Sequence, residues 1–328
     1  MVVVNYNGQE HLDESLSALC ADRSFPRTEI LVVDNASTDG SLEIAQGYAV
    51  RLASEVSVRV LRCPVNRGYA GGVNLSLAQA RGKYLAVLNM DVTVTPGWLT
   101  GLIGFLQTHP EVGAASPLIV LASDEQLVNA AGQDVHVTGL GFNRGLSRPR
   151  PAFGLEPARV SGIHGGAFVI RRALLEQMGG WDESGFLYHE DVDLSWLLRL
   201  MGHELYCVPR SVVRHNYVLT MYPEKLFLLE RNRCAMLLAH LETASLFLLA
   251  PFLVFTEALM WCYCLLRGRA FLKAKAASYR WLIRQRNQIR ARKAFVQSIR
   301  RRSDWQVLAG SAWGYAWDQF FTLGRERD

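Results

Sequence analysis

Residues 66–91 read NRGYAGGVNLSLAQARGKYLAVLNMD, a predicted helix followed by a predicted buried strand. Residues 71–81 carry Val73, Leu77 and Ala80 on one helical face, whereas Tyr84–Leu88 is a short apolar run typical of a strand. The strand leads directly into Asn89-Met90-Asp91. This passage from a helix to a buried strand and then to an acid predicts an α/β fold.

The same alternation occurs earlier in the chain. Met1–Asn5 and Glu29–Val33 are short apolar runs, and the second ends at Asp34. A β-α-β-α-β order favours a mostly parallel sheet with right-handed crossovers, in which ligands bind beyond the carboxyl ends of the strands. Polar clusters are expected at those ends: Asn5-Tyr6-Asn7, Asp34-Asn35, Asn66-Arg67-Gly68 and Asn89-Met90-Asp91.

Asp91 and His215 are candidate ligands for a divalent cation. An acid after a buried strand can hold Mg²⁺ or Mn²⁺ together with substrate phosphates, and a neutral imidazole suits Mn²⁺ better than Mg²⁺. Taken alone, Asp91 is also compatible with a turn or a helix cap, and His215 with an ordinary core or surface histidine. The residues by themselves leave both alternatives open.

A second acidic cluster lies in residues 179–199, GGWDESGFLYHEDVDLSWLLR. Glu190, Asp191 and Asp193 crowd the first turn of a predicted helix over 190–201. One interpretation is that they only complement the helix dipole. The other is that one of them is a general base for a hydroxyl group, next to the aromatic and polar residues that precede the helix.

Taken together, these motifs resemble family 2 glycosyltransferases of the GT-A fold, in particular the rhamnosyltransferase-like enzymes of bacterial polysaccharide assembly. The resemblance covers about residues 1–220, and its motifs occur in the order typical of the family. They are VVVNYNG, EILVVDNASTDGS, the stretch 66–91, the stretch 179–199 and VVRH at 212–215.

The resemblance implies a role for each candidate residue. Asn5, Tyr6 and Asp34 should line the nucleobase pocket, and Arg67 should lie near the base or the diphosphate. Asp91 should hold Mg²⁺ or Mn²⁺, with His215 as a further ligand. Asp191 should be the catalytic base. The remaining assignments are Asn89 in the nucleotide-sugar site and Trp181, Asp182 and Glu190 in the acceptor and sugar site.

The implied reaction is a single displacement with inversion, which moves one sugar from a nucleotide-diphosphate sugar to a glycan or polyprenyl-linked acceptor. The resemblance suggests dTDP-L-rhamnose as the donor, with a UDP-sugar as the alternative. Met90 stands where subgroup members often have proline, so the role of Asp91 is the firmer one. Rival functions are a polyprenyl-phosphate sugar synthase and a catalytically silent membrane-bound scaffold. No motif of a processive polymerase is complete.

The last third of the chain differs in composition from the rest. Residues 244–266 are an apolar run with one charge, Glu257, and one proline, Pro251. Residues 267–302 follow with 13 Lys and Arg and no acid, and 305–323 form an aromatic tail. We therefore expect a GT-A catalytic domain over 1–220 and a helical region over 221–328.

The apolar run is long enough to span a bilayer, but a buried core helix is the alternative. A single crossing would separate a cytosolic catalytic domain from a basic segment that also prefers the cytoplasmic side. A peripheral, re-entrant or single-segment anchor on the cytoplasmic face of the inner membrane resolves this conflict. The basic segment would then bind anionic lipid, and we expect no nucleic-acid partner.

Cysteines and the start of the chain add one expectation each. The six cysteines have no metal-binding spacing, which indicates reduced thiols in a cytosolic setting. The opening residues MVVVNYNGQE show no signal-peptide pattern. Half of the 328 residues are hydrophobic and 20% are charged, which excludes a disordered or collagen-like chain.

Overall fold

The computed structural model describes residues 1–25, 28–51, 57–218 and 220–322. The chain divides into two compact units. The sheet unit comprises Met1–Gln133, Asn143–Phe186 and Glu204–Tyr217, and the helical unit comprises Asp134–Phe142, Leu187–His203 and Val218–Asp328. The predicted domains were continuous, 1–220 and 221–328, whereas the helical unit also takes in two earlier segments. Residues 323–328, which include the last residue of the predicted aromatic tail, lie outside the described residues.

Four parallel strands form one half of the main sheet, in the order β3-β2-β1-β4. They are β1 (Val2–Asn5), β2 (Glu29–Asp34), β3 (Ser57–Arg62) and β4 (Tyr84–Asn89). Asn5 is in register with Asp34, and Val4 with Asn89. The pairing therefore brings the polar ends of three strands to one edge of the sheet, as the alternation of elements predicted.

The other half of the sheet is mixed. β11 (Ala167–Arg171) runs antiparallel to both β4 and β6 (Val112–Leu121), and β12 (Glu204–His215) runs parallel to β6. β5 (Val92–Val94) pairs with the end of β12, where Val92 is opposite His215. This pairing carries His215 back to the chain that follows Asp91. The smaller strands are β7 (Asp124–Ala130) and β10 (Ala158–Arg159), with β8 (Gln133–Val135) and β9 (Gly141–Asn143) as a separate pair.

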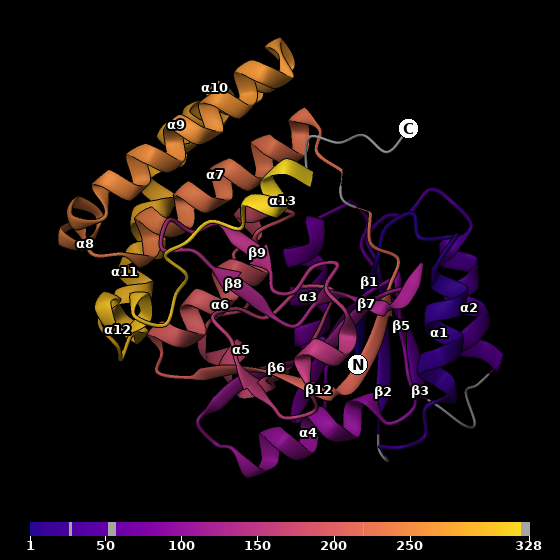
Figure 1. Ribbon diagram of the computed structural model, residues 1–328. Coiled ribbons are helices and arrows are strands. Elements are labelled where there is room, and N and C mark those ends of the chain that lie inside the picture. Colours follow the sequence, from indigo (N-terminus) through magenta and orange to yellow (C-terminus); the bar gives the residue numbers. More distant parts are fainter. Residues whose placement is uncertain (26–27, 52–56, 219, 323–328) are drawn as a thin grey trace. The chain divides into compact units, whose positions relative to one another are not determined.

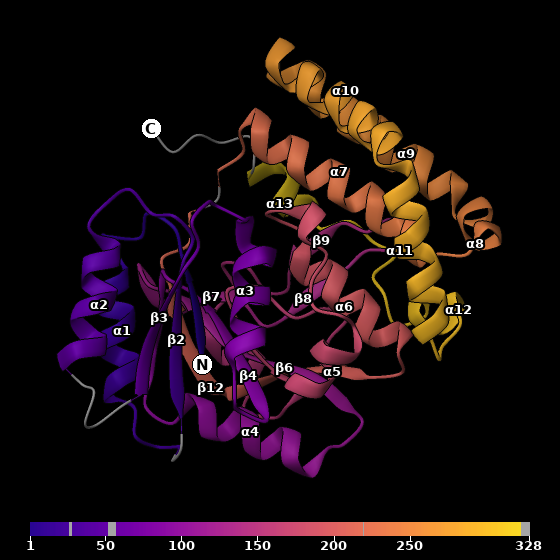
Figure 2. The same ribbon diagram turned by 180° about the vertical axis from the view of Figure 1, so that it is seen from behind.

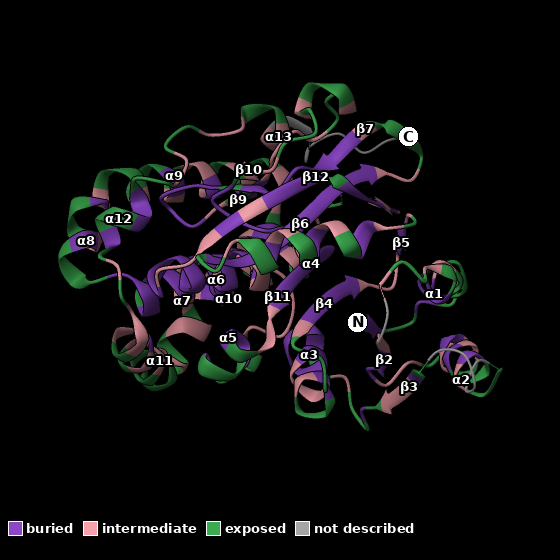
Figure 3. Cartoon of the chain, turned by 90° about the horizontal axis from the view of Figure 1, so that it is seen from below, coloured by how far each residue is buried: buried purple, intermediate pink, exposed green. Residues whose placement is uncertain are grey.

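Helices cover both faces of the sheet. α1 (Leu12–Ala21), α2 (Ser41–Arg51) and α4 (Trp98–Thr108) share a core with inward residues such as Val3 and Val32. α3 (Gly68–Gln79), in front of the sheet in Figure 2, packs on the alternate residues Val4 and Val33. Figure 3 shows β4 and β6 buried along almost their whole length. The predicted α/β class is thus confirmed. Short elements in this unit are η1 (Arg150–Phe153), α5 (Arg172–Gln177) and η2 (Glu183–Gly185).

The helical unit contains α6 (Glu190–Leu200) and the helices that follow β12. These are α7 (Pro223–His240), α8 (Thr243–Leu248), α9 (Ala250–Arg267), α10 (Arg269–Arg284), α11 (Arg286–Ile299), α12 (Asp304–Leu308) and α13 (Trp317–Thr322). The apolar run is two helices rather than one, because the chain bends before Pro251, which lies in the first turn of α9. Within the described residues, α9 alone has the length and composition of a membrane span.

A buried ionic cluster joins α7, α9 and α10, which lie side by side in Figure 1. Arg233 of α7 bonds Glu230 (Nε to Oε1, 2.8 Å) and Glu257 of α9 (Nη2 to Oε1, 2.6 Å). Lys275 of α10 is fully buried and contacts Glu230 and Glu257, the latter at 2.7 Å. Because each charge has an opposite partner, burial is tolerated here. Burial by itself would raise the pKa of Glu257, but Arg233 and Lys275 outweigh it and lower that pKa.

Candidate active site

Asn5 and Asp34 lie together at the carboxyl edge of the parallel strands. Asn5 is fully buried, and its Nδ2 donates to Asp34 Oδ1 (3.2 Å), Ser37 Oγ (3.0 Å) and Ser41 Oγ (2.9 Å). Asp34 is only 2% exposed. The amide of Asn5 therefore fixes the Asp34 carboxylate and the turn that starts α2. Tyr6, the next residue, is 44% exposed and turns toward solvent.

Arg67 lies at the start of α3, and a network that the sequence reasoning missed holds it there. The Asn35 side chain accepts from the Arg67 N–H (2.9 Å) and donates to the Gly68 carbonyl (2.8 Å). The Arg67 guanidinium pairs with Glu183 at 2.6 Å, and Asn74 donates to the other oxygen of Glu183 at 3.0 Å. Burial raises the pKa of Glu183, but bonds from Asn74 and Arg67 outweigh it and lower that pKa.

Gly68 is required by a close approach of the backbone. Its φ is +70°, and a Cβ added there would lie 2.0 Å from the Phe186 carbonyl oxygen. Any other residue would force the start of α3 away from the chain around Phe186.

Asp91 and His215 face each other. His215 Nε2 lies 3.4 Å from Asp91 Oδ2, and His215 Nδ1 lies 2.9 Å from the amide oxygen of Asn129 on β7. An amide oxygen can only accept, so Nδ1 carries a proton, and Nε2 is the ring nitrogen that faces Asp91. Asn129 thus orients His215 as partners of metal-bound histidines do. Sequence reasoning missed Asn129, because 86 residues separate it from His215.

The donor set at this point fits a divalent cation. Asp91 Oδ1 is buried and has no hydrogen-bond partner among the described residues. Burial raises the pKa of Asp91, but His215 outweighs it and lowers that pKa, which keeps the carboxylate charged at neutral pH. No set of three His, Cys, Asp or Glu converges within the described residues. A cation held here would take its other ligands from substrate and water, which is common for Mg²⁺.

His164 adds a second imidazole ring to this neighbourhood. Its centroid is 5.8 Å from that of His215, and its Nδ1 accepts from the Gly166 N–H at 3.0 Å. Burial, with the nearby His215, lowers the pKa of His164 to about 3, so this imidazole is neutral. Asn89, on β4, is half-buried, and its own N–H donates to the Gly166 carbonyl.

Trp181 packs inside the sheet unit, and Asp182 caps a short helix. Trp181 is 7% exposed, its ring lies 6.3 Å from that of Phe168, and its backbone exchanges two hydrogen bonds with Asn74. Asp182 caps η2 through a bond from the Ser184 N–H at 3.0 Å. Their assignment to the acceptor and sugar site stays a prediction.

The three acids at the start of α6 differ in their surroundings. Asp193 pairs with His240 (3.2 Å) and Arg292 (3.6 Å), which makes it a structural residue. Asp191 keeps partial exposure, and its Oδ1 accepts from the Val192 N–H. Glu190 buries Oε2 without a hydrogen-bond partner among the described residues. Burial and the neighbouring Asp191 raise the pKa of Glu190 to about 8.

Three non-glycine residues just before α6 have left-handed backbone conformations. Phe186, Tyr188 and His189 have φ values of 62°, 66° and 72°. Such conformations cost free energy and persist where surrounding contacts impose them, often at functional sites. Here Asn232 of α7 donates to the carbonyls of Leu187 (3.1 Å) and Tyr188 (2.9 Å). Nothing in the local sequence signals these three residues, because none of them is glycine or asparagine.

The candidate residues are therefore shared between the two units. The sheet unit carries Asn5, Tyr6, Asp34, Arg67, Asn89, Asp91, Trp181, Asp182 and His215, whereas the helical unit carries Glu190 and Asp191.

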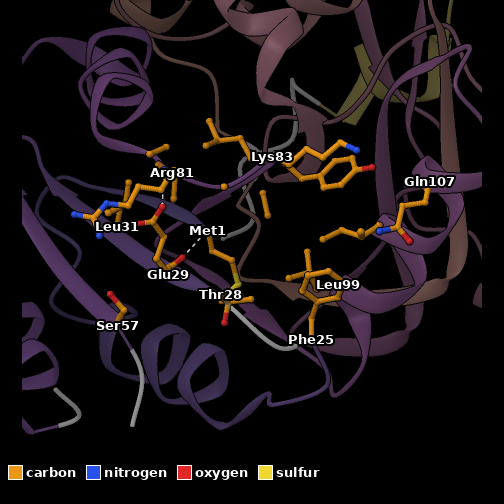
Figure 4. A pocket seen from close by; sticks show the side chains of 17 residues that line it. Met1, Phe25, Thr28, Glu29, Leu31, Ser57, Arg81, Lys83, Leu99 and Gln107 are labelled. Carbon is orange, nitrogen blue, oxygen red and sulfur yellow. Dashed lines mark hydrogen bonds between the residues drawn. The ribbon is translucent and has the colours of Figure 1, made fainter. Parts of the chain in front are cut away.

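A pocket of about 470 Å³ opens at the other edge of the sheet, where the parallel strands begin. Met1, Glu29, Arg81 and Leu99 are among its lining residues, and the amino group of Met1 donates to the Glu29 carbonyl (Figure 4). None of the candidate site residues lines it. Since ligands of such sheets bind beyond the carboxyl ends of the strands, we assign no role in catalysis to this pocket.

Comparison with known proteins supports the resemblance found in the sequence. The family model described as "Glycosyl transferase family 2" matches residues 1–179. The N-acetylglucosaminyl-diphospho-decaprenol L-rhamnosyltransferase of Mycobacterium tuberculosis is 31% identical over 238 residues, which cover 66% of this chain and 75% of that protein.

Solved structures share the fold at low identity. GalNAc-T7 with UDP, GalNAc and Mn²⁺ superposes with a TM-score of 0.59 at 18% identity, over 74% of this chain and 48% of that chain. The mannosyltransferase PcManGT of Pyrobaculum calidifontis, solved with GDP-Man and Mn²⁺, gives a TM-score of 0.55 at 19% identity, over 91% of this chain and 84% of that one. Fold, family match and the relative among rhamnosyltransferases agree: the chain belongs to glycosyl transferase family 2 and is a glycosyltransferase.

Proposed function

We propose that the chain transfers one sugar, with inversion, from a nucleoside-diphosphate sugar to a polyprenyl-linked glycan acceptor in the assembly of a cell-surface polysaccharide. The observation that carries the proposal is the pair Asp91 and His215: His215 Nε2 lies 3.4 Å from Asp91 Oδ2, and Asp91 Oδ1 is buried without a hydrogen-bond partner among the described residues. L-Rhamnose from dTDP-L-rhamnose is the proposed sugar, because a relative at 31% identity is an L-rhamnosyltransferase by name. That relative's name also supports the polyprenyl-linked acceptor.

Each residue group has a proposed part in the reaction. Asp34, held by Asn5, accepts hydrogen bonds from the nucleobase, and Tyr6 and Arg67 border the nucleotide. Asp91 and His215 hold Mg²⁺ or Mn²⁺, which when bound offsets the charge that grows on the departing diphosphate. Solved proteins of the same fold that contain Mn²⁺ support this cofactor.

Asp191 is the proposed general base. It removes the proton from the acceptor hydroxyl while the hydroxyl oxygen attacks the anomeric carbon on the side opposite the diphosphate. Its neighbour Glu190 has a pKa raised to about 8 by burial and by Asp191, so Glu190 is largely protonated at neutral pH. Asn89, Trp181, Asp182 and Glu190 complete the proposed sugar and acceptor site.

The proposed place of action is the cytoplasmic face of the inner membrane, where a lipid-linked acceptor and a cytosolic nucleotide sugar meet. The apolar helix α9 and the basic residues 267–302 support attachment to an anionic membrane.

A donor panel tests the function directly. The purified full chain is incubated with dTDP-L-rhamnose or UDP-sugars and a polyprenyl-diphosphate-linked N-acetylglucosamine acceptor, with Mn²⁺, with Mg²⁺ or with EDTA. We expect rhamnosyl transfer that EDTA abolishes, and weakened metal-dependent donor binding in Asp91→Ala. Transfer to polyprenyl phosphate alone would favour the synthase alternative. Absence of transfer from every donor would favour the silent scaffold.

A further inference from the structure

α9 presents an exposed stripe without a charged residue. The exposed residues of the helix recur every three or four positions and continue the exposed end of α8. We call this set the apolar stripe: Phe247, Leu248, Pro251, Phe252, Val254, Phe255, Ala258, Cys262, Leu265 and Leu266. Val254 is 68% exposed and Leu266 is 83% exposed. Exposed apolar side chains gathered in one continuous stripe mark an interaction site.

The polar groups of α9 face the opposite way, into the protein. Thr256 is buried and donates to Thr138 at 3.1 Å, and Glu257 is held by Arg233, Lys275 and Tyr279. The single charge in the apolar run is therefore neutralised inside the helical unit. This leaves an uninterrupted apolar surface outward.

α9 and α10 form an antiparallel hairpin, so a membrane that enclosed α9 would also enclose α10. Tyr263 packs on Phe271 near the turn, and Trp261 stacks on Tyr279 further along, at centroid distances of 5.9 and 6.1 Å. α10 exposes Lys273, Arg280 and Arg284. A membrane-spanning α9 would carry those charges into the hydrocarbon, where exposed charges are costly.

Aromatic side chains border the stripe near its start. Trp313 packs on Phe252 (5.3 Å), and Tyr315 packs on Phe255 (5.6 Å). Trp313 and Trp317 remain 43% and 45% exposed. Tryptophan and tyrosine favour the headgroup level of a bilayer. The stripe and these rings therefore both suit the interface between a membrane and water.

We propose that α9 lies in the plane of a single leaflet, with the apolar stripe at the boundary between headgroups and acyl chains and the exposed basic side chains of 267–302 on the headgroups. The occupant of the stripe is an anionic bilayer, because residues 267–302 contain no acid and expose seven Lys and Arg side chains, whereas Lys275 is buried in the ionic cluster. This inference rests on the proposed membrane attachment and states its geometry. It does not depend on which sugar is transferred.

Depth measurements on the full chain distinguish this geometry from a crossing. Cys262 lies on the stripe and is exposed, whereas Cys20, Cys63, Cys207 and Cys264 are buried. A fluorophore is placed on Cys262 or, in its absence, on a single cysteine introduced as Leu248→Cys or Val254→Cys, and its quenching by lipids with nitroxides at shallow or deep positions is measured. An in-plane helix gives equal, shallow depths at the three sites. A middle site deeper than the two ends, or ends on opposite surfaces, would overturn the proposal.

Binding to vesicles tests the occupant. Flotation with mixed phosphatidylcholine–phosphatidylglycerol vesicles is compared with phosphatidylcholine alone, for the full chain and for Val254→Asp with Leu265→Asp. We expect at least tenfold weaker binding of the double variant, weaker binding without the anionic lipid, and no change for Val50→Asp, which alters a valine on α2 that is even more exposed than Val254. Unchanged binding of the double variant would refute the stripe as the contact.

Two further readouts keep the outcomes separate. If the double variant dissociates a dimer in sedimentation experiments but floats normally, the stripe binds a second copy and the proposal fails. Transfer to a soluble acceptor analogue without vesicles should persist in the double variant. Loss of vesicle binding with normal transfer supports the proposal, whereas vesicle binding without transfer from any donor counts against the proposed function alone.

Discussion

Two acidic sites, Asp91 in the sheet unit and Glu230 with Glu257 in the helical unit, differ in how fully opposite charges compensate them. In the sheet unit, Asp91 faces one histidine and keeps a buried oxygen without a hydrogen-bond partner among the described residues. In the helical unit, Glu230 and Glu257 each contact both Arg233 and Lys275. An acid with incomplete compensation is available to a ligand, whereas a fully compensated acid serves the fold. On α6, Asp193 has the cationic partners His240 and Arg292, and Asp191, two positions before it, is the proposed general base.

Asp191→Asn should give the largest effect. Removing a general base is expected to lower kcat by roughly 10²- to 10⁴-fold. Nucleotide binding, measured by calorimetry, should stay near that of the wild type. Asp193→Asn is the matched control: it should lower the melting temperature, because His240 and Arg292 lose their partner, and affect kcat far less. If both variants changed only stability, the contrast between the two acids would be wrong.

Lys275→Met should destabilise the chain by about 3–5 kcal/mol, because it leaves the buried Glu230 without one of its two cations. Denaturant unfolding measures this loss. Adding Glu230→Gln should recover part of it, and Lys273→Met, at an exposed position of the same helix, should be neutral. A Lys275→Met protein as stable as the wild type would show that the cluster does not hold the three helices.

Asn129→Ala should weaken Mn²⁺ binding by about 10- to 100-fold, since His215 loses the acceptor that orients it. Asn129→Asp keeps an acceptor oxygen and should retain most of the affinity. Titration followed by the electron paramagnetic resonance of free Mn²⁺ gives both values. Equal affinity in the alanine variant would exclude Asn129 as a positioning residue.

Glu190→Gln should produce the smallest effect, visible as a change in pH dependence. The pKa of Glu190 is raised from 4.5 to about 8 in the folded chain, so between these values the unfolded chain has lost a proton that the folded chain keeps. The free energy of unfolding should therefore fall as pH rises through this window and level off above it. Unfolding curves at several pH values should show a shallower fall in Glu190→Gln. An identical slope in both proteins would contradict the raised pKa.

Sequence reasoning predicted what local pattern encodes. Strand ends placed Asn5, Asp34 and Asn89 at one edge of the sheet, and the registers of β1, β2 and β4 confirm that placement. It could not find Asn129, Asn74 or Glu183, because their partners lie 86, 107 and 116 residues away.

The helical unit shows the same boundary between local and distant information. The composition of residues 244–266 predicted an apolar segment correctly, and Pro251 marks the start of α9. The pattern gave no sign that Glu257 would be neutralised by α7 and α10, because those partners come from other helices. The roles assigned to individual site residues stay predictions.

The ionic cluster also has a consequence for synthesis of the chain. Glu230 leaves the ribosome 45 residues before Lys275. The acids of α7 and α9 therefore emerge before Lys275, the second of their two cationic partners. Docking of these helices should therefore wait until α10 has been made, and the helical unit should acquire protease resistance in one late step. Stalled nascent chains that end before and well after residue 279 would reveal this order: resistance of α7 in the shorter chains would contradict it.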